Sequence, residues 1–194
     1  MALKLITPAG TSPVSLAEAK AHLRVDIADD DTLIAAMIAA ATDMAEQHTG
    51  RALMAQTWEL TLDTFPEAFE LTRVPAQSIT SLKYYDTSGV QQTLSNALYS
   101  LDATDDFGYA YVAPVYGAEW PETRAQANAV ACRYVAGYAD AASVPQAIKS
   151  WILLMVSAMY ENREAEAYSA RAVSTTVKMS FVDALLARYR GGTV

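Results

Sequence analysis

The stretch from Ser15 to Leu53 constrains the fold more than any other part of the chain, because it predicts two consecutive helices. Glu18 follows Ser15 at the spacing of a capping box, in which the hydroxyl and the carboxylate each accept from the other residue's backbone N–H. Apolar residues then recur at helical spacing, on one face. We therefore predict a first helix over residues 16–23.

A second helix is predicted over residues 32–49. The acidic run 29–31 suits a helix N-terminus, and Gly50 suits a left-handed stop. Apolar side chains recur at spacings of three and four, which is typical of a core-facing stripe. The core positions predicted from this helix are Leu33, Met37, Ile38 and Met44. Alanines cover the other sides, so we expect the helix to be buried in a core or between subunits.

From Gln56 onward the apolar spacing changes from helical to alternating, which is typical of half-buried strands. The turn around Gly89 would join two of them into a hairpin. The predicted strands cover residues 56–63, 69–74, 78–86, 90–94, 99–101, 109–112 and 128–138. The middle of the chain therefore predicts a small antiparallel β module.

Pro145 suits the first position of a third helix, predicted over residues 145–163. Its core positions are Ile148, Ile152 and Met155. After a stretch without a clear period, residues 180–190 predict a terminal amphipathic helix. Its residues of interest are Phe181, Val182, Leu185, Leu186, Arg188, Tyr189 and Arg190. Its apolar face can fold onto the chain's own core or lie in a groove on another protein.

These segments together predict an α+β fold that is mainly α, namely a helical bundle with a small antiparallel β module inserted between helices. Residues 1–55 and 144–194 form the predicted helical domain. Residues 56–143 form the inserted module, as part of the same compact unit. A chain of 194 residues suits one domain with a sizeable core.

Charge and hydropathy exclude two classes of partner. A net charge of −8 argues against a surface that grips DNA, although DNA can still pass through an assembly of such chains. No apolar run approaches the roughly 18 residues of a membrane span, so we expect no membrane partner. Nothing at the N-terminus resembles a signal peptide, so assembly in the cytoplasm is expected.

The sequence predicts no catalytic, cofactor-binding or metal-binding residues. His22 and His48 lie near predicted helix ends, where they complement the helix dipole. The single cysteine, Cys132, lies in an alternating apolar run and is expected to be a buried small side chain. The acidic runs at 29–31 and 102–106 lack the spacing of a calcium loop, so we interpret them as a helix cap and a solvated turn. A phosphate-binding loop, a nucleophile elbow and a zinc-protease motif are all missing from the sequence.

The order of these segments resembles the head–tail connector proteins (adaptor or head-completion proteins) of long-tailed double-stranded-DNA phages and related prophage-derived particles. The resemblance is carried by five stretches, SLAEAKAHLRVD at 15–26, DDDTLIAAMIAAATDMAEQHTGRAL at 29–53, QTWEL at 56–60, VPAQSITSLKYYD at 74–86 and VPQAIKSWILLMVSAMYENREA at 144–165. The β insertion is similar to that of the longer family members.

The resemblance implies a structural adaptor that forms a ring, usually twelve-fold, under the portal protein. Such a ring extends the DNA channel without sequence-specific DNA binding and supports the next neck or tail protein, so the expected location is the virion neck. A neck stopper or tail-completion protein is expected as a partner of the ring, and the first alternative is that this chain is itself such a protein. A hydrolase that uses acidic residues is the second. From the residues themselves we predict that 180–190 bind portal, through the seven positions given above.

Overall fold

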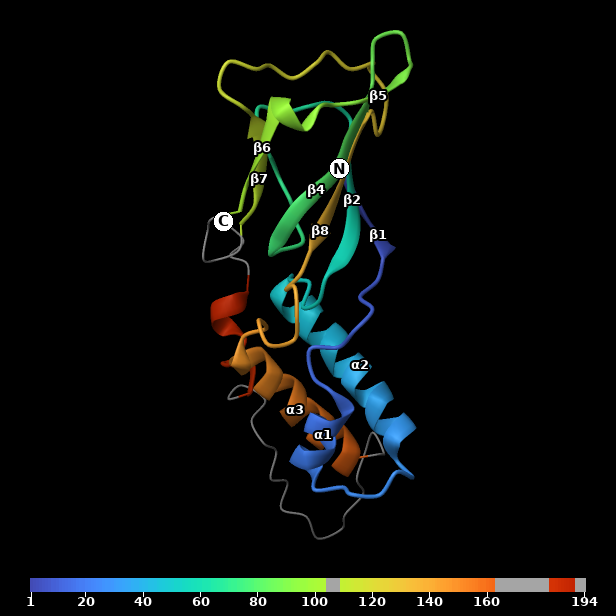
Figure 1. Cartoon of the computed structure of the whole chain (residues 1–194), viewed down its shortest axis with the longest axis vertical. Coiled ribbons are helices and arrows are strands. Elements are labelled where there is room, and N and C mark those ends of the chain that lie inside the picture. Colours follow the sequence, from blue (N-terminus) through green and yellow to red (C-terminus); the bar gives the residue numbers. More distant parts are fainter. Residues whose placement is uncertain (104–108, 163–181, 191–194) are drawn as a thin grey trace, which may run out of the picture. The chain divides into compact units, whose positions relative to one another are not determined.

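The computed structural model describes residues 1–103, 109–162 and 182–190. The chain divides into two compact units, each built from separated stretches of sequence. Unit 1 contains residues 1–10 and 50–139, and unit 2 contains residues 11–49 and the chain from 140 to 192. Figure 1 shows the strands of unit 1 and the helices of unit 2 with the labels used below.

Unit 2 is built on three α-helices that contact one another, α1 (Leu16–Leu23), α2 (Asp31–Thr49) and α3 (Gln146–Glu161). Their predicted positions are confirmed to within two residues at each end. The capping box also forms, because the Ser15 side chain accepts from the Glu18 backbone while the Glu18 carboxylate accepts from the Ser15 N–H. The predicted left-handed stop is present at Gly50, with φ of +70°.

Among the three α-helices of unit 2, the large buried side chains come from α2 and α3, while α1 buries Ala19. Trp151, Ile34 and Ile148 are each fully buried. The Lys149 ammonium donates to the Glu18 carboxylate at 3.0 Å, and so links α3 to the start of α1. The hydrophobic spacing of three and four therefore does produce one shared helical core, as the sequence predicts.

Unit 1 contains two antiparallel sheets. The first has the strand order β1-β2-β8-β4-β5, from β1 (Ala2–Thr7), β2 (Gln56–Leu62), β8 (Val130–Ala136), β4 (Ala76–Tyr85) and β5 (Gln91–Thr93). The second has the order β3-β7-β6, from β3 (Phe69–Glu70), β7 (Tyr111–Pro114) and β6 (Tyr99–Asp102). A 3-10 turn, η1 (Asn96–Leu98), precedes β6.

The inner faces of the two sheets share one hydrophobic core. Because successive strand residues point to opposite faces, Leu60, Cys132 and Leu82 align across three strands and all point inward. Phe69, Val112 and Leu101 align in the same way on the second sheet and belong to the same core. Unit 1 is thus a β-sandwich with its own interior.

The prediction of a mainly α helical bundle is wrong, because helix and strand make similar contributions to this mixed fold. Two observations explain the error. The lead-in, expected only to be extended, supplies the edge strand β1, which pairs with β2 along most of its length. The short segments around β3, β6 and β7 form a second sheet that encloses a core, so the β part is more than a small insertion.

Candidate assembly surfaces

The described part of the predicted terminal helix is residues 182–190, and its backbone is less regular than predicted. Residues 182–183 are helical, turns follow, and the segment ends in the 3-10 helix η2 (Ala187–Tyr189). Phe181 and the first predicted residue of this helix, Ser180, lie outside the described residues. The same holds for the stretch without a clear period that precedes it, residues 168–179.

The side chains of this segment differ in exposure. Val182 and Leu186 are buried, and the Asp183 carboxylate accepts a hydrogen bond from the Trp151 indole N–H at 3.4 Å. Leu185 and Tyr189 are half-buried, whereas Arg188 and Arg190 are exposed. The two apolar positions at 182 and 186 are thus covered within the chain, and the two guanidinium groups remain accessible to a partner.

The predicted core positions also divide by exposure. Ile148, Ile152, Met155 and Ile38 are buried, Met37 and Met44 are half-buried, and Leu33 is 37% exposed. The side of α2 that carries most of its alanines is exposed, which leaves a face where another helix can approach closely. The exposed alanines are Ala35, Ala36, Ala39 and Ala40.

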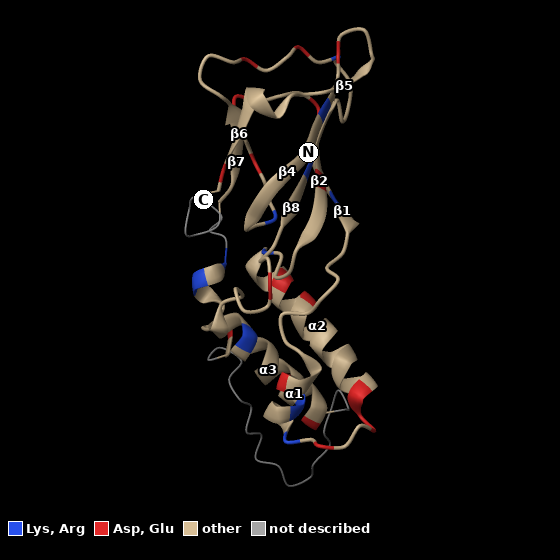
Figure 2. Ribbon diagram, in the orientation of Figure 1, with Lys and Arg blue, Asp and Glu red and all other residues tan. Residues whose placement is uncertain are grey.

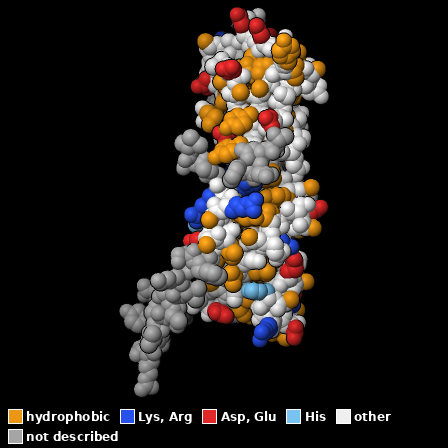
Figure 3. Space-filling model, turned by 90° about the vertical axis from the view of Figure 1, so that its left-hand side faces the viewer, with side chains coloured by type: hydrophobic (Ala, Val, Ile, Leu, Met, Phe, Trp, Pro, Cys, Tyr) orange, Lys and Arg blue, Asp and Glu red, His pale blue; other side chains and the backbone are white. Residues whose placement is uncertain are grey.

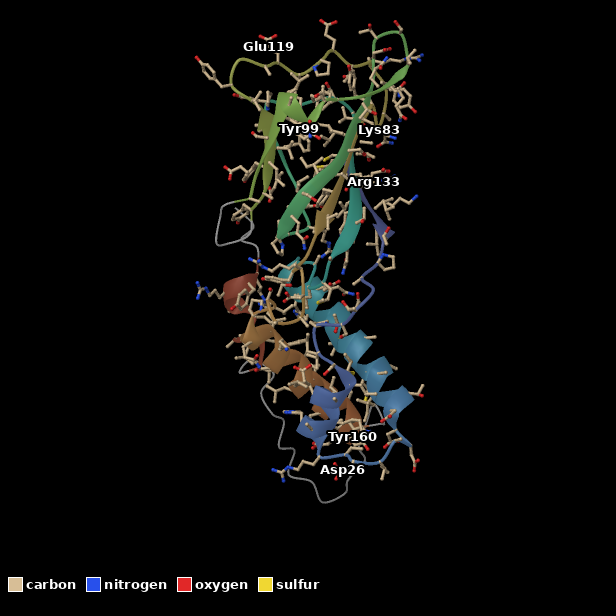
Figure 4. The ribbon with its side chains drawn as sticks, in the orientation of Figure 1. Asp26, Lys83, Tyr99, Glu119, Arg133 and Tyr160 are labelled. Carbon is tan, nitrogen blue, oxygen red and sulfur yellow. The ribbon has the colours of Figure 1, made fainter. Side chains whose placement is uncertain are left out.

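The acidic run before α2 makes structural contacts. Asp31 pairs with Lys20 of α1, and the Asp30 carboxylate accepts from the Tyr160 hydroxyl of α3. These contacts tie the start of α2 to both other helices, and Figure 4 labels Tyr160 on α3. Within the described part of the chain no cluster of three or more metal-binding side chains occurs.

The histidine, cysteine and aspartate side chains considered as possible catalytic or metal-binding groups have ordinary surroundings. The ring of His48 meets the ring of Trp151 edge-on, with centroids 5.7 Å apart. Cys132 is buried, and burial raises the pKa of its thiol to about 12, so it stays protonated. Asp102 is exposed, while the rest of the predicted acidic turn lies outside the described residues.

Unit 1 carries an open groove of about 770 Å³ that the sequence reasoning missed. Its walls include Trp120, Tyr116 and Pro114, and its carboxylates come from Glu67 and Glu119. The Trp120 ring stacks on Phe65 with centroids 4.6 Å apart, and its indole N–H donates to the Glu67 carbonyl at 3.2 Å. The sequence feature that could have indicated this groove is the pair of aromatic residues in the loop PVYGAEW, residues 114–120.

Comparisons with known proteins extend these observations. The family model described as phage gp6-like head-tail connector protein matches residues 13–107. No curated protein matches the chain. Among the described helices, none is both long and apolar enough to cross a bilayer.

Three solved structures from gene transfer agent particles resemble the whole chain, and each match covers 100% of this chain and 97% of the other. A chain of the native virion is 25% identical, with a TM-score of 0.79. A chain in the neck of the empty particle, computed with C6 symmetry, is 24% identical, with a TM-score of 0.78. A chain in the neck of the native particle, computed with C12 symmetry, is 23% identical, with a TM-score of 0.77. The predicted resemblance is confirmed, since residues 13–107 match the model of phage gp6-like head–tail connector proteins and the similar solved structures come from gene transfer agent particles.

Proposed function

We propose that this chain is a structural head–tail adaptor in the neck of a tailed phage or phage-like particle. The observation that carries the proposal is the full-length similarity to a gene transfer agent virion chain, together with the connector family match. The match to that virion chain extends over 100% of this chain and 97% of the other, with a TM-score of 0.79, and two further similar chains come from the necks of such particles. A catalytic role is not part of this proposal.

In the proposed assembly, copies of the chain form a ring between the portal protein and the next neck or tail protein. The twelve-fold expectation is supported by the C12 symmetry used for the neck of a similar particle. A net charge of −8 per copy, repeated around a ring, would repel phosphates and let DNA pass without sequence-specific binding.

We still propose that residues 180–190 bind the portal. Some of their side chains would anchor the segment, and others would contact the portal. Val182 and Leu186, being buried, would hold the segment on its own unit. Arg188 and Arg190, being exposed, would meet acidic groups on the portal. The variant Arg188→Glu with Arg190→Glu should lose portal binding without a change in melting temperature. Its matched control, Leu186→Ala, should lower the melting temperature, and normal portal binding by the double Arg variant would contradict the proposal.

The adaptor proposal itself is tested by deleting the gene and examining the particles. Deletion should give DNA-filled or empty heads and free tails that do not join, and the protein supplied in trans should restore joining. Quantitative mass spectrometry of purified necks should give equal numbers of this chain and portal subunits. Tailed particles that form without the chain, or a single copy per neck, would overturn the proposal.

A further inference from the structure

The two outer faces of the β-sandwich carry opposite charges. Every charged residue of the five strands in the first sheet lies at an outward-facing position: Lys4, Glu59, Lys83 and Arg133. The charged residues of the three strands in the second sheet are Glu70 and Asp102, both acidic and both outward-facing. Figure 2 shows these charges along the strands.

The first sheet presents what we call the basic face. Lys4, Glu59 and Arg133 are aligned neighbours in one row across β1, β2 and β8. Arg133 donates twice to the Glu59 carboxylate, at 2.7 and 3.1 Å, so this guanidinium is already paired. Lys83 lies in the next row, beside Ala131, and is exposed. The remaining outward-facing strand positions carry uncharged side chains, so the basic face carries net positive charge.

Carboxylates just outside the basic face are engaged locally. Asp63 follows β2 and accepts from the Asn128 backbone N–H at 2.8 Å. Asp86 follows β4 and accepts from the backbone N–H groups of Ser88 and Val90. These hydrogen bonds orient both carboxylates toward backbone N–H groups at the ends of their strands.

The second sheet presents what we call the acidic face. Glu70, Tyr111 and Asp102 form one aligned row across β3, β7 and β6, and Tyr111 is 43% exposed. The groove described above adjoins this row, because its wall includes the outward-facing Ala113. Glu67 and Glu119 add two carboxylates to aromatic walls, a combination that suits a Lys or Arg side chain.

Figures 3 and 4 place the two faces within unit 1. Figure 3 looks onto the side that carries β6 and β7, where acidic and hydrophobic side chains share the surface. Figure 4 labels Lys83 and Arg133 on the strands of the first sheet and Glu119 in the loop at the top of the view, above β6 and β7. The opposition of charge is therefore a property of one compact unit.

We propose that the basic face of one copy docks against the acidic face and groove of the next copy, and so closes the ring. This inference rests on the ring in the proposed function. A ring requires two different, complementary surfaces on every subunit, because its contacts run head to tail. A pair of oppositely charged faces on opposite sides of one β-sandwich meets that requirement, and it also disfavours pairing of like faces.

DNA is the competing occupant of the basic face, and the charges favour a protein. The face carries three cations, one of which is paired with Glu59. Tight phosphate binding needs a denser cluster of unpaired cations. The matching acidic surface, in contrast, is present on the same chain.

The test uses two charge-reversal variants of the full chain, expressed with portal and the other neck proteins. The basic-face variant combines Lys4→Glu with Lys83→Glu, and the acidic-face variant combines Glu70→Lys with Glu119→Lys. The control variant, Asp26→Lys with Glu161→Lys, changes net charge as much as the acidic-face variant but lies in unit 2, at exposed positions. Assembly is measured as copies of the chain per purified neck.

Each face variant alone should assemble at least about tenfold less well, because the charge attraction is reversed in the basic-face variant and cancelled in the acidic-face variant. Expressed together, the two variants should assemble again, since an even-numbered ring accepts strict alternation of the two. Recovery in the mixture also shows that both variants fold. The control should assemble normally.

Three results would overturn the docking proposal. These are normal assembly by either face variant alone, no recovery in the mixture, and a control that fails as badly as the face variants. Normal necks with impaired DNA retention in the basic-face variant would assign that face to DNA instead. The wild-type chain distinguishes failure of this proposal from failure of the adaptor role. If the wild-type chain is missing from purified necks, the adaptor role is refuted. If wild-type and variant chains both form normal rings, only the docking proposal is refuted.

Discussion

The Glu18 carboxylate joins the start of α1 to α3, so replacing Glu18 by Gln tests how unit 2 is held together. The carboxylate accepts from the backbone N–H and the hydroxyl of Ser15, each at 2.7 Å, and from Lys149 at 3.0 Å. These bonds lower the pKa of Glu18 from 4.5 to about 2, with the Ser15 backbone N–H as the largest cause, followed by the Ser15 hydroxyl and Lys149.

The magnitude follows from the pKa shift and the exposure. At about 1.4 kcal/mol per pH unit, the shift sets an upper limit of about 3 kcal/mol. The Glu18 side chain is 46% exposed, so solvent screens its interactions. We therefore expect Glu18→Gln to lower the free energy of unfolding by about 1 kcal/mol at pH 7. Because the folded-state pKa is depressed, this contribution is present above pH 4.5 and is lost as the pH falls toward 2.

The assay is denaturant unfolding of wild type and Glu18→Gln from pH 7 down to pH 2, with hydrogen exchange of α1 and α3 amides as a probe of unit 2. The difference between the proteins should shrink between pH 4.5 and 2. Glu122→Gln, at an exposed position of unit 1, is the matched control and should show no such gap. A difference that persists unchanged at pH 2, or no difference at pH 7, would refute the reasoning.

Three further predictions concern single buried positions. Gly137 has φ of +112°, and an added Cβ would lie 2.1 Å from the Met54 carbonyl oxygen, so Gly137→Ala should destabilise the protein strongly in thermal melts, while Gly10→Ala, where nothing lies within 4 Å, should not. Trp151→Ala, at a fully buried position, should cost about 3 to 5 kcal/mol in denaturant unfolding, and a loss below 1 kcal/mol would contradict its core role. Cys132, whose thiol pKa is raised to about 12, should not react with a thiol reagent at pH 8 until denaturant is added, and rapid labelling of the native protein would count against its burial.

Local signals in the sequence predicted the helices well. The pairing of Ser15 with Glu18 placed the start of α1 correctly, because a capping box needs only residues three apart. Gly50 marked the end of α2 for an equally local reason, its tolerance of positive φ. Alternation also placed β2 and β8, whose long apolar patterns follow from a half-buried sheet.

Non-local pairing is what the sequence reasoning missed. Strands were predicted close to β3, β6 and β7, but such short segments do not reveal that they pair with each other into a second sheet over a shared core. The charge on the two sandwich faces depends on the register between strands distant in sequence, such as β1 with β2. For the terminal segment, the sequence left two alternatives, docking on another protein or folding back onto the chain's own core. The spacing of Val182 and Leu186 alone does not reveal that both are buried within the chain.

The interleaved order of the two units has a consequence for synthesis on the ribosome. The helices α1 and α2 are made first, but their partner α3 begins only at Gln146, after nearly all of unit 1 has been translated. At bacterial and eukaryotic elongation rates, residues 50–145 take roughly 5 to 20 seconds to add. During that interval the apolar side of α2, including Ile34 and Ile38, is without α3. The nascent chain therefore exposes this apolar side at that stage, and all residues of the β-sandwich core are translated before α3 is.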